Sequence, residues 1–442
     1  MTAAEAARTF NRLLAEDPAA AVEQAAAMDA AFLARGVTFD GAPMRSFLRP
    51  HLLARADWEV LRAAGRRLME LAARAARRAF DGDVQRLLDW LGIPEAEARW
   101  IRHDPGEPDV VLSRLDAFLA PDGPRFIEVN SDAPAGFGYG DCMAEVIAEL
   151  PAFRELSRRC PVRYHPSAPA LLDAVPRAAR GGAPVVAIVD WAEVKTRGDQ
   201  EILRQAFAAR GVTCLLADPR AVDVHDGRLW AEGRAVDVVY RRAVLSELVA
   251  REDEVGAFRR AYHEGLAAFV NTFRCQLSED KAFLALLTDE AFAGLLSPEE
   301  QALVDATVPW TRKLEERRTR RHGGEVDLVP FVLAHREELV LKPAHSYGGR
   351  SVFVGTETPA GEWERAVAAG VGKPWVVQER VAIPEEEFPV VVDGQLRFEA
   401  LGVNANPFYV AGADAGAVAR ASHGAVINVS AGGGSMPTFV VG

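Results

Sequence analysis

The chain has 442 residues, 49% of them hydrophobic, which is enough material for about three domain-sized units of ~150 residues each. Its 63 acidic side chains outnumber the 51 basic ones, and the resulting charge of −12 argues against nucleic acid as a partner, because no basic field is present to replace counterions. No stretch approaches the roughly 18 consecutive apolar residues that a membrane span needs.

Cysteine usage and the amino terminus indicate the compartment. The cysteines lie far apart and show no metal-type spacing, so we interpret them as reduced thiols: Cys142, Cys160, Cys214 and Cys275. The first residues, Met1 to Arg8, lack the pattern of a signal peptide. We therefore expect a cytoplasmic protein. No pattern in the sequence indicates its oligomeric state.

Residues 1–95 are expected to be mostly helical. Asp17 followed by Pro18 is typical of a helix start, and Gly36 is typical of its end. Asp57 is predicted to cap a later helix in the same way. That helix has apolar side chains spaced for one buried face, at Leu61, Leu68 and Leu71.

Residues 113–132 form a predicted β-hairpin. Residues 121–124 (Pro-Asp-Gly-Pro) supply its turn, and the flanking residues alternate between polar and apolar. Asp116 lies on the first strand, while Glu128 and Asn130 are two residues apart on the second strand and so share one face. Three oxygen-bearing side chains therefore converge from two paired strands.

Such a group of oxygens suits Mg²⁺, which usually takes one or two carboxylates together with substrate phosphates. Arg114 precedes Asp116 by two residues and is expected to face the same way. The alternative is the solvated outer face of a hairpin. The apolar residues around the polar pair favour a buried strand instead; they are Phe126, Ile127 and Val129.

Residues 184–245 have the pattern of a βαβ unit, in which parallel strands are joined by a covering helix. Its predicted strands and helix are Val185–Val189, Gln200–Arg210, Val212–Leu216 and Val236–Tyr240. Parallel sheets bind ligands beyond the carboxyl ends of their strands. Four residues at such ends are candidates to contact an acceptor substrate: Asp190, Trp191, Arg241 and Arg242. Alternatively, the two arginines only tie this unit to its neighbour.

Residues 339–355 are predicted to form a strand that ends in Lys342, a glycine turn and a second strand. A lysine at a strand end can hold a phosphate oxygen as a compact charge. Gly348 and Gly349 allow the backbone to fold closely over phosphates and to direct N–H groups at them. The alternative is an ordinary hairpin with a surface lysine.

Together the two hairpins resemble the glutathionylspermidine synthase family, a branch of the ATP-grasp ligases with a permuted order of elements. The family pattern Arg-x-Asp, then Glu-x-Asn-x-Asp-x-Pro, is matched with similar spacing by Arg114-Leu-Asp116 and Glu128-Val-Asn130-Ser-Asp132-Ala-Pro134. The resemblance covers roughly residues 100–442. It implies that Asp116, Glu128 and Asn130 are Mg²⁺ ligands, and that Arg114 steadies the charge on an acyl phosphate.

The later segments follow in the order of that family. Residues 271–289 are similar to the segment that carries the first ATP lysine, here Lys281, and Lys342 would be the second. Residues 375–381 resemble the hinge strand that holds adenine through its backbone. The resemblance thus implies a set of nucleotide-binding residues: Lys281, Lys342, Ser346, Gly348, Gly349, Gln378, Glu379 and Val381.

The closing strands of the family are similar to residues 408–412, 417–420 and 426–430, and Arg420 would be the late catalytic arginine near the phosphates. The implied fold class is α/β: an ATP-grasp fold of two α+β lobes that grip ATP, a Rossmann-like parallel-sheet unit and a helical N-terminal region. We expect the helical region at residues 1–95 and the metal-ligand hairpin segment that completes the core at residues 96–180. The Rossmann-like substrate unit is expected at residues 181–270 and the ATP-grasp lobes at residues 271–442.

The resemblance also implies a function. It indicates an ATP-dependent carboxylate–amine ligase that uses ATP and Mg²⁺ and acts on a small-molecule carboxylate and a small-molecule amine. An acyl phosphate would form first, and the amine would then displace phosphate to leave an amide. Positioning and charge neutralisation dominate such a phosphoryl transfer, so lysines and arginines suffice without a protein nucleophile.

Two alternatives remain open. Related ligases often carry a metal-binding glutamate in the glycine loop, whereas His345-Ser346-Tyr347 has no acid. This absence leaves open the number of Mg²⁺ ions, and with it a catalytically inactive nucleotide-binding protein of the same fold. The second alternative is a nicotinamide-dependent oxidoreductase, because Gly136-Phe-Gly138-Tyr-Gly140 imitates a dinucleotide fingerprint, although its third glycine comes one residue early.

Overall fold

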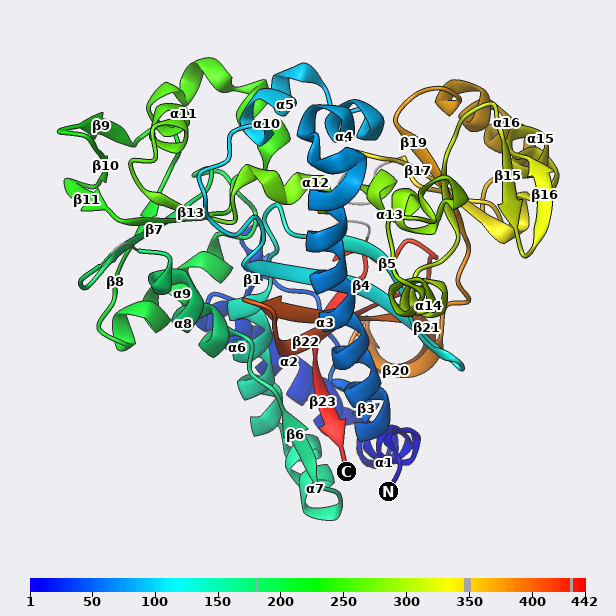
Figure 1. The fold of residues 1–442 in the computed structure, drawn as a ribbon. Helices are drawn as coiled ribbons and strands as arrows, with labels where there is room; N and C mark the ends of the chain where they lie inside the picture. The colour runs from blue at the N-terminus through cyan, green and yellow to red at the C-terminus, as the bar shows by residue number, and fades with distance from the viewer. Residues whose placement is uncertain (180, 346–350, 430–431) are drawn as a thin grey trace.

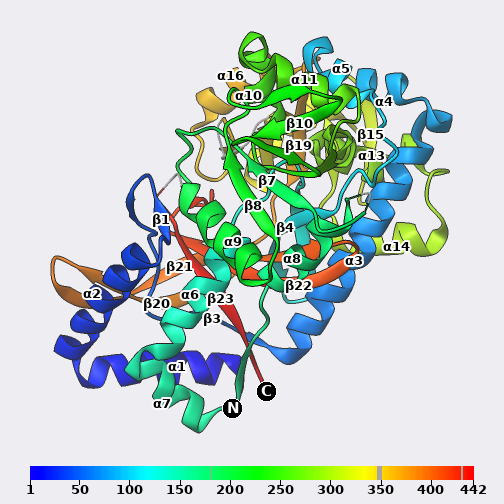
Figure 2. The same ribbon diagram turned by 90° about the vertical axis from the view of Figure 1, so that its left-hand side faces the viewer.

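The computed structural model describes residues 1–179, 181–345, 351–429 and 432–442. A large, mostly antiparallel sheet lies in the middle of the molecule, with a parallel sheet on one side and a smaller antiparallel sheet on the other (Figure 1). The two chain ends lie close together in both views (Figure 1 and Figure 2). Every helix in the described residues is too short or too polar to span a membrane.

The large sheet takes its strands from distant parts of the chain. Its order is β3-β23-β22-β21-β4-β5, with β20 beside β21 and β6 beside β23. Only β3 and β23 run parallel to each other. The strands are β3 (His51–Ala54), β4 (Leu112–Ala120), β5 (Gly123–Asn130), β6 (Val162–Tyr164), β20 (Glu385–Val392), β21 (Gln395–Val410), β22 (Ala413–Ser422) and β23 (Gly434–Val441). The expected division of the chain into four ranges stays a prediction.

The long helix α3 (Arg55–Arg78) crosses one face of the large sheet (Figure 1). Its predicted apolar stripe is confirmed, since Leu61, Leu68 and Leu71 are at most 1% exposed and pack in one cluster with apolar side chains of β4 and β5. The predicted cap is wrong, because the helix begins two residues before Asp57. The Asp57 carboxylate lies in the first turn of the helix, where its negative charge interacts favourably with the positive end of the helix dipole.

Side-chain caps mark the starts of three other helices in the N-terminal region, α1, α2 and α4. At α2 the predicted start is confirmed, because Pro18 is its first residue and the Asp17 carboxylate accepts the N–H of Ala20 at 3.0 Å. The elements are α1 (Ala3–Glu16), α2 (Pro18–Ala34), the hairpin β1 (Thr38–Phe39) and β2 (Ala42–Pro43), α4 (Val84–Leu91), α5 (Glu95–Ile101), α6 (Phe137–Glu149), α7 (Pro151–Arg159) and α8 (Ala168–Arg177).

The predicted parallel sheet is confirmed, with strand order β13-β12-β7-β8 and all neighbours parallel. A small antiparallel sheet of β9, β10 and β11, inserted between β8 and β12, was not expected from the sequence. The elements are β7 (Val185–Val189), α9 (Arg197–Ala209), β8 (Thr213–Ala217), β9 (Asp223–His225), β10 (Arg228–Ala231), β11 (Arg234–Val236), β12 (Val238–Arg241), α10 (Leu245–Ala250), α11 (Gly256–His263) and β13 (Ala268–Val270).

The smaller antiparallel sheet has the order β14-β19-β17-β18. The two strands predicted around the glycine turn are confirmed, because β17 and β18 pair with each other. This lobe packs around its own buried tryptophan, Trp363. Its elements and the helices leading to it are α12 (Gln276–Glu279), α13 (Lys281–Thr288), α14 (Pro298–Thr307), β14 (Thr311–Lys313), β15 (Arg318–Arg321), β16 (Gly324–Asp327), α15 (Leu328–Ala334), β17 (Leu339–Pro343), β18 (Phe353–Val354), α16 (Ala360–Gly370) and β19 (Trp375–Glu379).

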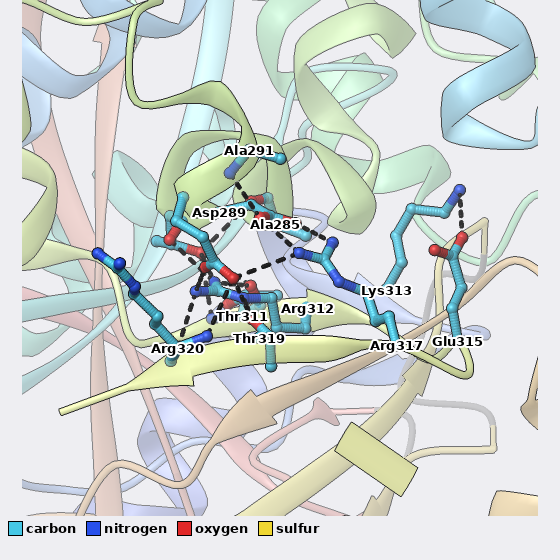
Figure 3. Close-up of polar contacts among 12 residues, drawn as sticks. Ala285, Asp289, Ala291, Thr311, Arg312, Lys313, Glu315, Arg317, Thr319 and Arg320 are labelled. Carbon is cyan, nitrogen blue, oxygen red and sulfur yellow. Dashed lines mark hydrogen bonds and ion pairs between the residues drawn. The ribbon is translucent and has the colours of Figure 1, made fainter. Parts of the chain in front are cut away.

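A buried polar network fixes β14 against the end of α13 (Figure 3). The guanidinium of Arg312, which is 2% exposed, donates to the Thr319 hydroxyl at 2.7 Å and to the Thr311 carbonyl at 2.8 Å. Arg317 and Asp289 form an ion pair at 2.5 Å in the same network. Because these groups are bonded in several directions, Thr311 is held firmly at the edge of β19.

Candidate active site

A cavity of about 220 Å³ lies between the large sheet and the small antiparallel sheet, and we call it the lysine cavity. Strands β4, β5, β21 and β22 supply one wall, and α13, β17, β18 and β19 supply the other. The predicted site residues in its lining are Arg114, Asp116, Glu128, Asn130, Lys281, Lys342, Gln378, Glu379, Val381 and Arg420. All the residues assigned to ATP, Mg²⁺ or catalysis that the structure describes therefore meet in one place, whereas the four candidates for acceptor contacts at strand ends of the parallel sheet lie outside this lining.

Strands β4 and β5 place four polar side chains as a block on one face. Arg114 lies opposite Asn130, and Asp116 lies opposite Glu128, across the antiparallel pair. Leu115, between the two β4 members of the block, is fully buried in the core cluster that includes α3. The predicted hairpin and its shared polar face are confirmed, and the alternation of the strand explains both faces.

Asp116 is the centre of this block. Its Oδ1 accepts from Arg114 Nε and from Asn130 Nδ2, each at 3.1 Å, and its Oδ2 lies 3.2 Å from Arg420 Nη1. Burial raises the pKa of Asp116, but the two arginines outweigh burial and hold the pKa below its ordinary value. Burial, with repulsion from Arg114, lowers the pKa of Arg420 to about 10, which leaves this arginine charged at neutral pH.

Lys281 enters the cavity from the first position of α13. The helix begins there because Asp280 caps it, accepting the N–H of Ala282 at 2.8 Å. The Lys281 ammonium lies 2.9 Å from a Glu128 carboxylate oxygen. Burial lowers the pKa of Lys281, but Glu128, with Asp280 and Glu279, outweighs burial, so the net shift is upward. The lysine is thus a buried, charged group next to the metal-ligand candidates.

Lys342 enters from β17, on the same wall of the cavity as Lys281. Its ammonium donates to Gln378 Oε1 at 2.8 Å and to the Ile127 carbonyl at 3.4 Å. The amide of Gln378 in turn donates to the Thr311 hydroxyl at 3.0 Å, so the network of the small lobe also orients this lysine. Burial lowers the pKa of Lys342 to about 8, although Glu128 acts to raise it.

The oxygen donors of the cavity suit a magnesium ion. Asp116, Glu128 and Asn130 bring carboxylate and amide oxygens to one face of the hairpin, and such hard oxygens are the ligands Mg²⁺ prefers. Within the described part of the chain, no three His, Cys, Asp or Glu side chains are grouped to hold a metal ion by themselves. An ion bound here would therefore complete its shell with phosphate oxygens or water.

Some predictions fall elsewhere. Ser346, Gly348 and Gly349 lie outside the described residues. The third closing segment was expected to be a strand, and this is wrong for its described part, because residues 426–429 form no strand. Instead, Val426 and Asn428 line the lysine cavity from a loop. The apolar run in this segment covers a cavity rather than pairing with a sheet.

Three polar lining residues were missed: Arg380, Asn404 and Asn428. Asn404 lies opposite Arg420 in the sheet and accepts the backbone N–H of that arginine at 3.2 Å. The sequence signal for Asn404 was the alternation Asn404-Ala-Asn406 in a long apolar segment. Amides in such a segment are buried and need hydrogen-bond partners, which indicates a polar site nearby.

A second cavity, of about 240 Å³, lies beside the lysine cavity, and we call it the side cavity. Arg114, Asn130 and Lys281 line both cavities and form their shared wall. The other lining residues come from helix ends and loops: Glu97, Asp132, Ala133, Pro134, Ala135, Val244, Ser246, Gln276, Glu279, Asp280, Ala344 and His345.

The two arginines at the end of β12 act as structural ties. Arg241 is fully buried and forms an ion pair with Asp132 at 2.5 Å, and Arg242 pairs with the buried Asp199 at 2.9 Å. Asp190 at the end of β7 is likewise buried. The two arginines therefore tie this unit to its neighbour rather than contact a substrate, since their guanidinium groups are already bonded inside the protein.

The glycines at the start of α6 serve packing. A Cβ on Gly138 would lie 3.0 Å from the Asp199 carbonyl, and one on Gly140 would lie 2.9 Å from a Val418 methyl. The Asp199 carboxylate also accepts the N–H groups of Gly138 and Tyr139 at 2.9 Å each. A carboxylate already occupies the place where a dinucleotide would put its pyrophosphate, so the oxidoreductase alternative is wrong.

Comparison with known families agrees with this geometry. The sequence profile of the family described as circularly permuted ATP-grasp type 2 matches residues 103–426. This match covers most of the chain, which therefore belongs to the circularly permuted ATP-grasp family, a family of ligases.

The relatives point the same way. A protein of Frankia alni, provisionally named glutamate–cysteine ligase 2-3, is 27% identical over 98% of this chain and 51% of its own length. The chain thus spans about half the length of this curated relative. The apo structure of a glutathione synthetase-like effector from Globodera pallida has a TM-score of 0.59 at 12% identity, with 96% of this chain and 98% of that chain covered. This similarity shows a shared fold.

A third protein is less similar in structure. It comes from Methylobacillus flagellatus and is provisionally named a γ-glutamylcysteine synthetase. The structure has a TM-score of 0.43 at 12% identity, with 86% of each chain covered.

Proposed function

We propose that the protein is an ATP-dependent carboxylate–amine ligase that forms an amide through an acyl phosphate and releases ADP and phosphate. One observation carries the proposal. Ten residues that the family resemblance assigns to ATP, Mg²⁺ or catalysis come from separate segments between Arg114 and Arg420, and all of them line the lysine cavity. A chance arrangement would not bring all ten to one cavity.

In the first step, the substrate carboxylate attacks the γ-phosphorus of ATP. Lys281 and Lys342 approach from one wall and hold phosphate oxygens, while Arg114 and Arg420, on the opposite wall, neutralise the charge that builds up on the transferred group. Asp116, Glu128 and Asn130 would hold Mg²⁺. The bound ion would neutralise phosphate charge and align the reacting oxygens.

In the second step, an amine attacks the acyl carbon and phosphate leaves. Arg114 and Lys281 line both cavities, so they adjoin the acyl phosphate and any group that enters from the side cavity. The backbone of β19, with Gln378, Glu379 and Val381 in the cavity lining, is our candidate to hold the adenine.

Other parts of the proposal rest on composition and on the relatives. From the cysteine usage we infer that the protein is cytoplasmic. From the charge of −12 we infer that its partners are small molecules rather than nucleic acid. Because a relative is named as a glutamate–cysteine ligase, glutamate and cysteine are the first acid and amine to test.

An inactive nucleotide-binding protein of the same fold is the second candidate for the function. The acid-free stretch His345-Ser346-Tyr347 favours that reading.

The test is an ADP-release assay over pairs of amino acids, short peptides and amines, with mass spectrometry of the product. We expect one acid–amine pair to give an amide and ADP together. Lys342→Ala should lower turnover at least ~100-fold, the scale for losing a preorganised charge-stabilising group. Lys373→Ala, an exposed lysine outside the cavity, is the matched control and should keep its activity. Near-normal turnover of Lys342→Ala would refute the proposed site.

A further inference from the structure

His345 lies where three segments of the chain meet. It follows Lys342 of β17 by three residues. One side of its ring faces Asp280, the N-cap of α13, and the other side faces Gly92, the residue that ends α4. Because Lys281 directly follows Asp280, the histidine joins the two segments that bring the lysines into the lysine cavity.

Both ring nitrogens of His345 face hydrogen-bond acceptors. Nδ1 contacts the Asp280 carboxylate, and Nε2 lies 3.0 Å from the Gly92 carbonyl oxygen. A carbonyl oxygen only accepts, and so does an ionised carboxylate, whose charge the N-terminal end of α13 favours. Each ring nitrogen must therefore carry a hydrogen, and an imidazole with both hydrogens is a cation.

The surroundings of the ring favour this charge. The His345 side chain is 18% exposed. Burial alone lowers the pKa of His345, but Asp280, the Gly92 carbonyl and Glu97 outweigh burial, so the pKa lies above its ordinary value. The ion pair is therefore fully formed below the ordinary histidine pKa of ~6.5 and is lost as the pH rises through the raised value. The other charged side chains that line the side cavity are Arg114, Asp132, Glu279 and Lys281.

The carboxylate of Asp280 transmits this contact to Lys281. Its Oδ1 accepts the N–H of Ala282 and its Oδ2 contacts His345, so the cap is held from both sides. The backbone N–H of Lys281 also donates to the Ala344 carbonyl at 3.4 Å. The start of α13 therefore touches the turn after β17 at two points, and these contacts help to fix the distance between the two lysines.

We propose that His345 is a positioning residue of the ligase: its imidazolium holds Asp280 against the turn after β17 and so keeps the two lysines at the separation that the ATP phosphates require. The inference rests on the proposed function. Loss of the ring proton removes one of the two bonds, because a neutral imidazole has one N–H for two acceptors. Nucleotide affinity then falls although the fold persists. ATP binding thus depends on the charge of a histidine that lines the side cavity.

The protonation state of His345 is measured directly by nuclear magnetic resonance on the full chain with isotope-labelled histidine. His345→Gln identifies its signal among those of the nine histidines. We expect both ring nitrogens to stay protonated above the ordinary pKa of ~6.5. Asp280→Asn keeps an oxygen that can cap α13 but removes the charge, so it should move the titration to lower pH. A ring that titrates below about pH 6.5, or an unshifted titration in Asp280→Asn, would overturn the proposal.

The second measurement is the affinity for a non-hydrolysable ATP analogue with Mg²⁺, by calorimetry. It is made at about pH 6.5, where Lys342, with a pKa of about 8, is charged. His345→Gln places an amide nitrogen at Nε2 but none at Nδ1, so it should weaken binding about tenfold, the scale of one hydrogen bond to a charged group. His345→Asn places an amide nitrogen at Nδ1, where it can donate to Asp280, and should recover part of the affinity.

Two comparisons separate positioning from stability. His335→Gln removes a ring that pairs with Glu338 at 3.1 Å outside both cavities, and it should leave the affinity unchanged. The ratio of wild-type to His345→Gln affinity should fall toward one as the pH rises, because the wild-type ring loses its proton. Titration of Lys342 affects both proteins alike and cancels in the ratio. Thermal melting shows that each variant is folded during the titration.

The outcomes separate the two proposals. If wild type and His345→Gln bind the analogue equally, or if their ratio stays constant with pH, the positioning role is refuted while the ligase proposal stands. If only the melting temperature of His345→Gln changes, the histidine serves stability alone, and the positioning role is again refuted. If the analogue binds to no form of the protein, the proposed function itself fails, and the positioning role fails with it.

Discussion

The lysine cavity and the side cavity share a wall but differ in charge and in origin. The lysine cavity has five Lys and Arg side chains against three carboxylates in its described lining, while the side cavity has four carboxylates against two Lys and Arg side chains and one histidine. The two shared cations, Arg114 and Lys281, belong to the common wall. The difference in charged side chains favours a polyanion in the lysine cavity over the side cavity.

The two cavities are also built differently. Most charged groups of the lysine cavity stand on paired strands, where alternation fixes the face they point to. The side cavity is assembled from α5, the loop after β5 and the junction of α12 with α13. Strand registry holds the first set rigidly, whereas the second set depends on how helix ends pack.

The largest effect is expected from the carboxylates opposite each other on β4 and β5. Asp116→Asn with Glu128→Gln should lower ADP release at least ~100-fold and raise the Mg²⁺ concentration needed for half-maximal activity. The reason is that the pair would lose its negative charge beside Lys281 and Arg420. A magnesium titration of ADP release measures both changes.

The matched control for this variant is in the other cavity. Glu97→Gln removes a single carboxylate where the double variant removes two, and it should leave the magnesium requirement as in wild type. If the double variant titrates with Mg²⁺ as wild type does, the metal site is misplaced. If Glu97→Gln shifts the magnesium requirement, the two cavities are not separate in function.

The sequence could predict the strand-built cavity but not the other. The hairpin of residues 113–132 revealed its shared face through alternation, and Lys342 stood at a recognisable strand end. Arg420 was reachable only through the family resemblance, because no local pattern marks an arginine in a long strand. Lys281 likewise depended on that resemblance.

Away from the shared wall, residues of the side cavity carried no periodic signal. Glu97 lies in a short helix of seven residues, and His345 lies in the turn after strand β17. Their proximity depends on tertiary packing, which local propensity does not encode. The strand wrongly expected at residues 426–429, the described part of that segment, has the same cause, since an apolar run such as Val-Ile-Asn-Val fits a strand or the lining of a cavity equally well.

The lysine cavity should respond to pH through Lys342. Burial lowers the pKa of Lys342 to about 8, and phosphates favour its charged form, so nucleotide binding should take up a proton. As pH rises above 8, nucleotide affinity should fall by up to about tenfold per pH unit. The side cavity has a group that titrates in the same range, because burial raises the pKa of Glu279 to about 8.

Calorimetry in buffers of different ionisation enthalpy, from about pH 7.5 to 9, measures this proton uptake. Lys342→Met is the needed control, because Glu279 titrates in the same range. This variant should lose most of the proton uptake with nucleotide. Proton uptake of the same size in Lys342→Met would show that another group is responsible.

The smallest effect is expected from Thr311→Val, which removes a neutral hydroxyl outside both cavities. Its hydroxyl accepts from Gln378, and Gln378 in turn accepts from Lys342. Losing the hydrogen bond from Gln378, about 1 kcal/mol, should weaken nucleotide binding roughly fivefold while the titration of the side-cavity histidine stays unchanged. The hydroxyl also donates to the Pro309 carbonyl at 2.8 Å, so the variant should lower the stability of the fold as well. Val has nearly the same shape as Thr, so the network around Arg312 keeps its packing. A shift of that titration as well would mean that the shared wall transmits strain between the cavities, and the separation argued from their charges would then be incomplete.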